Sequence, residues 1–295
     1  MTRPHAPRIV YVNGAFLPFE EARIPIMDRG FLFGDGIYEV TAVLEGRLID
    51  NDPHLLRLDR SLAGIGIRNP YSLAEWTTIQ RQLMRDNALE EGLIYIEVTR
   101  GVYEREFTCP PDIPPTVVMF TQVKPVRDNP NLTRGAAIIT VPDLRWARRD
   151  IKSTALLAQV LAKQEAKAAG VAEAWMVEDG FVTEGASSTA FLVTENDEIV
   201  TRPLSQAVLP GITRMAIIEV AKAMGLRLVE RPFAVEEIAT AREAFFTSAS
   251  TIAMPVVQVD GRQVGGGQPG PVVRALRERY LAAVMEQPRE DARQS

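Results

Sequence analysis

The strand-like segments of this chain follow one another in runs, with helical segments between the runs, and this order restricts the fold more than any other feature. Arg8–Val12 and Ala15–Phe19 flank Asn13-Gly14, a dipeptide typical of a two-residue hairpin turn. Ile37–Leu44 is rich in β-branched residues and turns at Glu45-Gly46 into another short strand. Runs of strands beside runs of helices predict an α+β fold rather than a doubly wound parallel sheet.

Helix signals follow these first strands. Asp52-Pro53 supplies an N-cap and a first-turn proline for a helix whose apolar positions are leucines. Ser72–Glu75 matches a capping box and predicts a second helix that ends near Asn87. Further strands are expected at Leu93–Thr99, Thr116–Val123, Ala136–Val141, Ala172–Val177 and Thr189–Val193 and near Phe245 and Val256, and further helices over Thr154–Ala169, after Gly211 and over Val272–Met285.

The length of the chain, 295 residues, suits two domains, because domains typically have about 100–200 residues. Residues 124–130 are polar and bracketed by prolines, so they are the best linker candidate. We therefore expect a small N-terminal α+β domain over 1–124, a linker over 125–130 and a larger C-terminal domain over 131–295. Functional sites often lie at such a junction.

Composition excludes several classes of function. The 33 Lys and Arg against 38 Asp and Glu give a net charge of −5, so no basic field is available for a nucleic acid or an anionic membrane. Cys109 as the single cysteine excludes an internal disulfide, and His5 and His54 leave little material for a metal site or a serine triad. Met1–Pro7 lacks the apolar core of a signal peptide, and no apolar run is long enough to span a membrane. We expect a cytoplasmic protein without a bound metal.

Lys152 is the first candidate for chemistry. It precedes a strongly apolar segment at 154–162, so it should lie at the edge of a core. One interpretation is an exposed lysine that leads into a helix. The other is an amine whose pKa is lowered by desolvation and by Arg148 and Arg149, which would make it a nucleophile for a carbonyl group.

Glu184 is the second candidate. The turn at Asp179-Gly180 predicts a hairpin just before Glu184, so Glu184 should lie at the end of a strand. Small residues follow it at 185–188 and leave room for a flat ring near the backbone. An ordinary polar loop is the alternative interpretation.

Several segments could bind a phosphate. Gly211 precedes a helix with Thr213 in its first turn, and such a helix start presents free N–H groups and a hydroxyl to an anion. The segment 246–251 is rich in hydroxyl groups, although it equally fits a simple turn. Arg57 lies among leucines, where it either snorkels to solvent or binds an anion with two hydrogen bonds. Tyr38 follows a tight Gly-rich turn and is either a core residue or one that projects from the strand start.

Taken together, an amine, an acid for a ring nitrogen and a phosphate cradle are the parts that a pyridoxal-phosphate site needs. The order of the motifs resembles that of the class IV (fold-type IV) pyridoxal-phosphate aminotransferases, which include D-amino acid transaminases, branched-chain aminotransferases and aminodeoxychorismate lyase. The resemblance extends from about Arg8 to Met285. Its matching pieces are Asp28-Arg29-Gly30, Phe33–Glu39, Arg57, Asp150–Ser153, Ala162–Ala166, Thr183-Glu184-Gly185 and Gly211–Arg214.

The resemblance implies the fold and the roles of individual residues. It implies a two-domain fold-type IV enzyme with the cofactor, pyridoxal 5′-phosphate, at the domain interface. Lys152 would hold the cofactor as an internal aldimine and move the proton during a ping-pong transamination, and Glu184 would keep the pyridine nitrogen protonated. The expected cofactor-binding residues are Arg57, Lys152, Glu184, Ser187, Leu209, Ile212, Thr213, Ser248 and Ala249, with Leu209 against the ring and Ser187 fixing Glu184 or the ring.

The resemblance also implies how the substrate binds. In D-amino acid transaminases the α-carboxylate is held by a tyrosine after the Gly-rich turn and by an arginine, a histidine and a second tyrosine of the partner subunit. Tyr38, Arg105 and Tyr95 match the first tyrosine, the arginine and the second tyrosine, whereas Phe107 stands at the histidine position. An obligate homodimer is therefore implied, with a D-amino acid of the D-alanine or D-glutamate type as donor and a 2-oxo acid as acceptor.

Alternatives to this substrate class stay open. Because Phe107 removes one carboxylate donor, Arg105 could bind the carboxylate alone or with another arginine, or the pocket could prefer an (R)-primary amine. Arg105 could also be a solvated loop charge between two glutamates. A branched-chain aminotransferase usually has a tyrosine where this chain has Leu157, and aminodeoxychorismate lyase usually acts on a dianionic aromatic substrate, for which no second cationic cluster is evident. A non-catalytic binding protein would be expected to lack the lysine or the glutamate.

Overall fold

The computed structural model describes residues 8–286, so His5 and the ends of the chain lie outside the described residues. The chain divides into two compact units. Of the described residues, the first unit contains 8–125 together with Ile151–Ala155, and the second contains Val126–Asp150 and 156–286. No helix in residues 8–286 has the length and apolar character needed to cross a membrane.

The first unit is built on a six-stranded sheet with the strand order β2-β1-β6-β5-β3-β4. All of its neighbouring strands pair antiparallel. The β1–β2 hairpin turns at Asn13 and Gly14, which both have positive φ, so the predicted hairpin is confirmed. The strands are β1 (Ile9–Val12), β2 (Ala15–Pro18), β3 (Gly36–Leu44), β4 (Arg47–Leu48), β5 (Glu91–Thr99) and β6 (Thr116–Val123).

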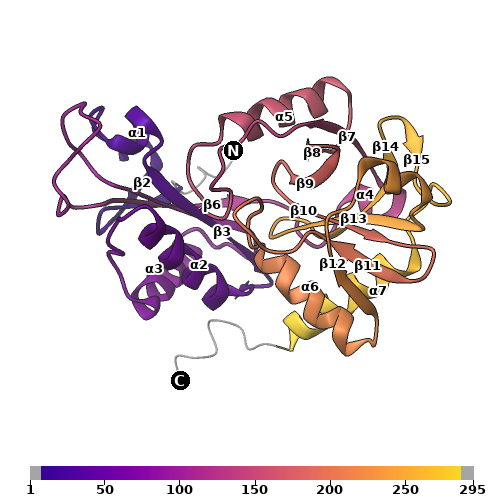
Figure 1. Ribbon diagram of the computed structural model, residues 1–295. Helices are drawn as coiled ribbons and strands as arrows, with labels where there is room; N and C mark the ends of the chain where they lie inside the picture. The colour runs from indigo at the N-terminus through magenta and orange to yellow at the C-terminus, as the bar shows by residue number, and fades with distance from the viewer. Residues whose placement is uncertain (1–7, 287–295) are drawn as a thin grey trace. The chain divides into compact units, whose positions relative to one another are not determined.

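Two longer helices cover one face of this sheet (Figure 1). They are α2 (Asn51–Gly64) and α3 (Leu73–Asp86), and the unit also contains η1 (Phe19–Glu21) and the short α1 (Arg29–Phe33). Leu58 and Leu62 of α2 and Trp76 of α3 are almost fully buried and pack with Ile94 and Ile96 of β5. This apolar contact forms the core of the first unit.

Side chains alternate between the two faces of a strand, so the core contacts also assign the opposite face. Ile37 in β3, Ile96 in β5 and Met119 in β6 belong to the core beneath the helices. Tyr38, Tyr95, Glu97 and Phe120 therefore lie on the other face. Tyr38 is the direct cross-strand partner of Glu97, and Tyr95 is the partner of Phe120.

The second unit is built on a nine-stranded sheet. Its strand order is β12-β11-β10-β13-β14-β7-β8-β9, and β15 pairs with β14 outside this path. Parallel and antiparallel pairs occur together, and Trp175, Phe246 and Met254 contribute to its core. The strands are β7 (Ala136–Pro142), β8 (Glu173–Glu178), β9 (Phe181–Gly185), β10 (Thr189–Val193), β11 (Glu198–Thr201), β12 (Arg227–Glu230), β13 (Glu243–Ser248), β14 (Ile252–Val259) and β15 (Arg262–Gln263).

The helices of the second unit are α4 (Pro130–Arg134), α5 (Leu157–Ala168), α6 (Ile212–Ala223) and α7 (Pro271–Met285), with η2 (Val235–Thr240) between strands. Arg277 of α7 is buried and donates hydrogen bonds to the carbonyls of Thr251 and Ala253. These carbonyls flank Ile252, which has a φ of +60°, a conformation that costs a β-branched residue energy. Arg277 therefore holds the end of the hydroxyl-rich segment in place.

The structure confirms the α+β class and corrects some helix starts. The capping box at Ser72 is present, and the hydroxyl accepts from the Glu75 amide. In contrast, α2 begins at Asn51, and its N-cap is Asp50 in a left-handed conformation rather than the expected Asp52. Helix α5 begins at Leu157 instead of at 154, because Ile151–Ala155 forms bridges and turns with the first unit.

Candidate active site

Lys152 lies in a short segment that adds to the edge of β3. The Tyr38 amide donates to the Lys152 carbonyl at 3.0 Å, and an isolated bridge joins Ile37 to Ser153. Because Ile151 points into the core of the first unit, the Lys152 side chain is directed to the opposite face. Its Nζ lies 4.1 Å from the centroid of the Tyr38 ring, which is within the range of a cation–π contact.

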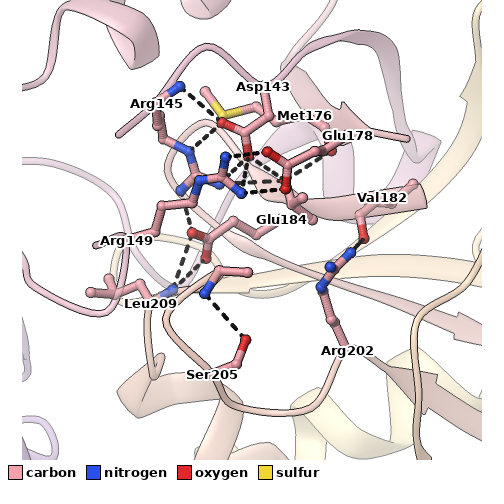
Figure 2. A network of polar contacts seen from close by, with 12 residues as sticks. Asp143, Arg145, Arg149, Met176, Glu178, Val182, Glu184, Arg202, Ser205 and Leu209 are labelled. Atoms are coloured by element: carbon pink, nitrogen blue, oxygen red, sulfur yellow. Dashed lines mark hydrogen bonds and ion pairs between the residues drawn. The ribbon is translucent and has the colours of Figure 1, made fainter. Parts of the chain in front are cut away.

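Glu184, near the end of β9, is buried in a network of paired charges (Figure 2). Nη1 of Arg145 binds Oε1 of Glu184, and Nη2 of the same guanidinium binds Oδ2 of Asp143 at 2.6 Å. The backbone N–H of Leu209 donates to both carboxylate oxygens of Glu184, at 3.1 and 3.2 Å. Asp143 in turn accepts a hydrogen bond from the Thr183 hydroxyl at 2.6 Å.

The electrostatics of this network follow from burial and from the shared guanidinium. Burial raises the pKa of Glu184, and the charge of Arg145 opposes that rise. Burial alone would also raise the pKa of Asp143, but the hydrogen bonds and charge of Arg145 lower it below its ordinary value. Arg145 therefore favours the ionised form of both carboxyl groups.

Arg148 and Arg149, which the sequence places near Lys152, are bound by carboxylates of the second unit. Arg148 pairs with Asp150 at 3.0 Å. Arg149 binds both oxygens of Glu178, at 2.9 and 2.7 Å. Each of these two arginines is therefore paired with a carboxylate of its own.

Arg57 binds an anion with two hydrogen bonds, which agrees with one of the two interpretations of the sequence. The anion is a carboxylate of the protein itself. Nε and Nη2 of Arg57 donate to the two oxygens of Glu39 at 2.7 and 2.8 Å, and Nδ1 of His54 lies 2.8 Å from the same carboxylate. All of these side chains are buried. Burial alone would raise the pKa of Glu39, but the charge and hydrogen bonds of Arg57 lower it well below its ordinary value.

The two segments of the second unit that the sequence suggests for phosphate binding lie beside β10. Helix α6 begins at Ile212 after Gly211, and Thr213 is buried in its first turn. A Cβ added to Gly211 would stand 2.8 Å from the Thr189 hydroxyl, and Thr189 pairs directly with Thr247 of β13. The start of α6 and the hydroxyl-rich segment that follows Thr247 are therefore brought to the same end of β10.

The hydroxyl-rich segment is ordered by its own hydrogen bonds. The Ser248 hydroxyl lies 2.7 Å from that of Thr251 and 3.3 Å from that of Ser250. Ala249 is half-buried between them. This arrangement fits the turn interpretation and leaves the amides of the segment at the same strand end as the start of α6.

Ser187 binds a carboxylate other than the expected one. Its hydroxyl donates to Glu173 at 3.2 Å, and Ser188 donates to the same oxygen at 3.1 Å. Nζ of Lys163 lies 2.7 Å from the other oxygen of Glu173. The structure thus corrects the expectation that Ser187 fixes Glu184, because Arg145 and the Leu209 amide have that role. Contact of Ser187 with the cofactor ring stays a prediction.

The candidate substrate tyrosines lie together on the open face of the first sheet. Tyr38 and Tyr95 are stacked with their centroids 5.6 Å apart, and Tyr95 stacks on Phe120 at 4.7 Å. The Tyr95 hydroxyl donates to Oε2 of Glu97 at 2.6 Å. Glu97 was not singled out in the sequence, although its place two residues after Tyr95 in a strand puts both side chains on one face.

Arg105 and Phe107 lie in the loop between β5 and β6. The guanidinium of Arg105 lies over the Phe33 ring at 5.5 Å, and the Phe107 ring lies 5.6 Å from the same ring. Arg29 fixes this loop by donating to the carbonyls of Glu106 and Phe107. Arg105 and Phe107 are both exposed.

The residues present fit pyridoxal phosphate in their chemistry. Thr247 is 2% exposed, and its hydroxyl has no hydrogen-bond partner within residues 8–286. A buried hydroxyl of this kind is costly, and a ligand at the end of β10 would provide its partner. Glu184 offers a buried carboxylate for a ring nitrogen and Lys152 offers an amine, whereas the described residues contain no cluster of His, Cys, Asp and Glu side chains suited to a metal ion.

Comparison with known proteins identifies the family. The family model for amino-transferase class IV matches residues 36–259. The D-alanine aminotransferase of Bacillus licheniformis is 36% identical over 280 residues, which cover 94% of this chain and 98% of that protein. The D-alanine aminotransferase of Staphylococcus aureus strain MSSA476 is 38% identical over 272 residues, or 92% and 96% of the two chains.

Solved structures agree with this result. A T.th. branched-chain amino acid aminotransferase complexed with N-(5′-phosphopyridoxyl)-L-glutamate has a TM-score of 0.88 and 26% identity, and the match covers 97% of each chain. The fold-type IV architecture that the motifs implied is thereby confirmed. The chain belongs to the class IV aminotransferases and is an enzyme whose cofactor is pyridoxal 5′-phosphate.

Proposed function

We propose that this aminotransferase moves an amino group between a D-amino acid of the D-alanine or D-glutamate type and a 2-oxo acid. The observation that supports this most is the identity of 36–38% to D-alanine aminotransferases over more than nine-tenths of the chain. Lys152 and Glu184 belong to different units, and their action on one cofactor is part of the proposal.

Lys152 is proposed as the catalytic amine. The hydrogen bond between its carbonyl and the Tyr38 amide fixes its backbone, and its Nζ lies over an aromatic ring. Within residues 8–286 no carboxylate lies within ion-pair distance of Nζ, so the amine gives up no ion pair when it forms a covalent bond. It would therefore be free to bond to the cofactor aldehyde and, once the substrate amine has displaced it, to move the α-proton of the substrate from Cα to the cofactor within the same half-reaction.

Glu184 is proposed as the group that binds the ring nitrogen. When bound, the cofactor would supply a protonated ring that accepts the electron pair left on the substrate carbon when the α-proton is removed. A carboxylate held ionised by Arg145 can accept a hydrogen bond from that ring nitrogen and keep the proton there. The Leu209 amide holds the same carboxylate from a second direction, which limits its rotation.

We propose that the cofactor phosphate binds at the start of α6. The amides of Ile212 and Thr213 have no acceptor within the helix at this end, and the helix dipole favours an anion there. The Thr213 hydroxyl and the amides near Ser248 and Ala249 would add further donors. Arg57 remains a proposed phosphate ligand, and its Glu39 pairing means that it would share its charge between two anions.

The substrate carboxylate is proposed to bind with the help of Tyr38 and Arg105. We also propose that the enzyme is a homodimer in which Arg105 and its loop serve the partner subunit. Large apolar side chains near this loop support an additional interface, since Phe31 and Phe107 are 76% and 84% exposed. Light scattering should then give twice the chain mass, and a monomer with full activity would contradict this part.

The test is a half-reaction panel read from the absorbance of the bound cofactor. Both enantiomers of alanine, glutamate and leucine would be compared with (R)-1-phenylethylamine. The proposal predicts a spectral change with D-alanine and D-glutamate and little change with the L-enantiomers. A response to L-leucine alone would support a branched-chain enzyme instead, and a response to the amine alone would support an amine transaminase.

The (R)-selective amine transaminase remains a second candidate because of Phe107. An aromatic side chain replaces a carboxylate donor there, and it contacts the Phe33 ring. Arg105→Ala separates the candidates: it should raise KM for D-alanine far more than KM for (R)-1-phenylethylamine. Equal effects on the two donors would show that Arg105 is not the carboxylate ligand.

A further inference from the structure

The hydrogen bond between Tyr95 and Glu97 constrains what the tyrosine can offer to a substrate. The hydroxyl of a tyrosine has a single proton, and here that proton is donated to Oε2 of Glu97 at 2.6 Å. The oxygen of Tyr95 then presents only lone pairs to any further ligand. A carboxylate has no proton to donate to those lone pairs, whereas an ammonium group has three.

Glu97 lies on the same face of the sheet as the candidate amine. It is the direct cross-strand partner of Tyr38, and the Lys152 Nζ lies over the Tyr38 ring. Tyr95 stacks on Tyr38 at a centroid distance of 5.6 Å. The Glu97 carboxylate therefore lies beside Tyr38, and the ring of Tyr38 contacts Lys152, near which the substrate amine must bind.

The charges around Glu97 favour a cation. Within residues 8–286 no Lys or Arg lies within ion-pair distance of Glu97, so its charge has no partner of opposite sign. Burial raises the pKa of Glu97, the Tyr95 hydrogen bond lowers it, and the carboxylate of Asp28 raises it. Asp28 is 1% exposed, and its Oδ2 has no hydrogen-bond partner in the described part of the chain.

We infer that Glu97 is a specificity-determining residue that selects amino donors with a second cationic group, such as the side-chain ammonium of D-ornithine, at Tyr95. This inference rests on the proposed D-amino acid transamination and names its preferred donor class. Tyr95 and Glu97 form an acceptor pair flanked by the aromatic rings of Tyr38 and Phe120, which is a suitable environment for an ammonium group. The α-carboxylate is then held without the Tyr95 hydroxyl.

The experiment compares D-ornithine with D-norvaline, which has the same carbon chain without the second ammonium. The holoenzyme should show a kcat/KM at least about tenfold higher for D-ornithine, because a hydrogen bond to a charged group typically contributes at least that factor. Glu97→Gln keeps the shape of the side chain and should reduce the D-ornithine to D-norvaline ratio about tenfold. Glu236→Gln, the same change at an exposed position in the second unit, should leave the ratio unchanged.

Tyr95→Phe provides a second readout that does not depend on the Glu97 variant. It should lower the D-ornithine to D-norvaline ratio and should reduce kcat/KM for D-ornithine about tenfold more than kcat/KM for D-alanine, because the hydroxyl accepts from the second ammonium group and does not donate to the α-carboxylate. Cofactor absorbance and melting temperature establish that each variant is folded and loaded. A tenfold rise in KM for D-alanine in Tyr95→Phe would overturn the inference.

The outcomes separate this inference from the proposed function. Turnover of D-alanine without a preference for D-ornithine, or a preference that survives both Glu97→Gln and Tyr95→Phe, refutes the role of Glu97 alone. Absence of turnover with every D-amino acid in the panel refutes both the proposed function and the inference. A preference for D-ornithine that both substitutions abolish supports the assignment.

Discussion

Replacing Arg145 with methionine removes the positive charge shared by two buried carboxylates. The Arg145 guanidinium bridges Asp143 and Glu184, whose side chains are 0% and 5% exposed. Methionine fills similar space without a charge or a donor. Glu184 would retain only the Leu209 amide among its hydrogen bonds in the network described above.

The expected loss of stability follows from the burial of these groups. Removing one partner of a buried ion pair typically costs about 3–5 kcal/mol, because a charge is left uncompensated in a poorly solvated site. The cost should depend on pH. The pKa of Glu184 is already raised in the folded protein, so its ionisation opposes folding above the unfolded value near 4.3. Without Arg145 that pKa rises further, so the variant should lose more stability at pH 8 than at pH 5.

The assay is urea unfolding of the apo-protein followed by tryptophan fluorescence, to which the fully buried Trp175 of the second unit contributes together with Trp76 and Trp146. Arg148→Met is the matched control, because Arg148 pairs with Asp150 at side-chain exposures of 40% and 28%, and solvent screens such an exposed pair so that its loss should change the stability little. Adding Glu184→Gln to Arg145→Met should recover part of the loss. Equal losses in the two arginine variants, or a loss independent of pH, would refute the reasoning.

Further substitutions test other parts of the structure by the same unfolding assay. Glu39→Gln should cost about 3 kcal/mol, because Arg57 would stay buried without its anion, and an unchanged midpoint would contradict the pairing. Gly101→Ala should cost about 1–3 kcal/mol more than Gly261→Ala, since both have positive φ but only at Gly101 would a Cβ meet a backbone oxygen, at 2.1 Å. Arg277→Met should cost about 3 kcal/mol by leaving buried carbonyls without a donor, and it should also weaken binding of pyridoxal phosphate more than binding of pyridoxal.

The elements with strong local signals could be predicted from the sequence. Asn13-Gly14 fixes a hairpin because both residues adopt positive φ readily, and Ser72 with Glu75 fixes a helix start through reciprocal hydrogen bonds. The start of α5 could not be found this way. Residues 154–156 have a helical pattern, but the segment before them is recruited to the edge of β3, and this long-range pairing overrides local preference.

Candidate site residues could be proposed from the sequence where the chemistry requires a particular residue type and the surrounding pattern identifies its position. Lys152 and Glu184 were singled out because an amine before an apolar segment and an acid at a strand end match motifs of the family, and their roles stay predictions. Arg145 was missed because its role depends on contact with Glu184, 39 residues away in sequence. Glu97 was not singled out for a related reason. Its proposed role depends on its hydrogen bond with Tyr95, and the sequence does not show which hydroxyl a carboxylate binds.

The charged residues of the proposed site differ in whether each is already paired with an opposite charge. This difference indicates how the proposed site would hold its cofactor. Arg57 and Glu184 are each bound to an opposite charge within their own unit, so both are fixed before a cofactor arrives. Lys152 instead rests on an aromatic ring, a contact that it can leave at small cost. In the proposed function, these fixed charges would hold the cofactor and Lys152 would bond to it, so the cofactor would stay in place whenever that covalent bond is exchanged for one to the substrate. If Lys152→Ala nevertheless lost pyridoxal phosphate as completely as it lost activity, the fixed charges would not be sufficient to hold the cofactor, and this division of roles would be wrong.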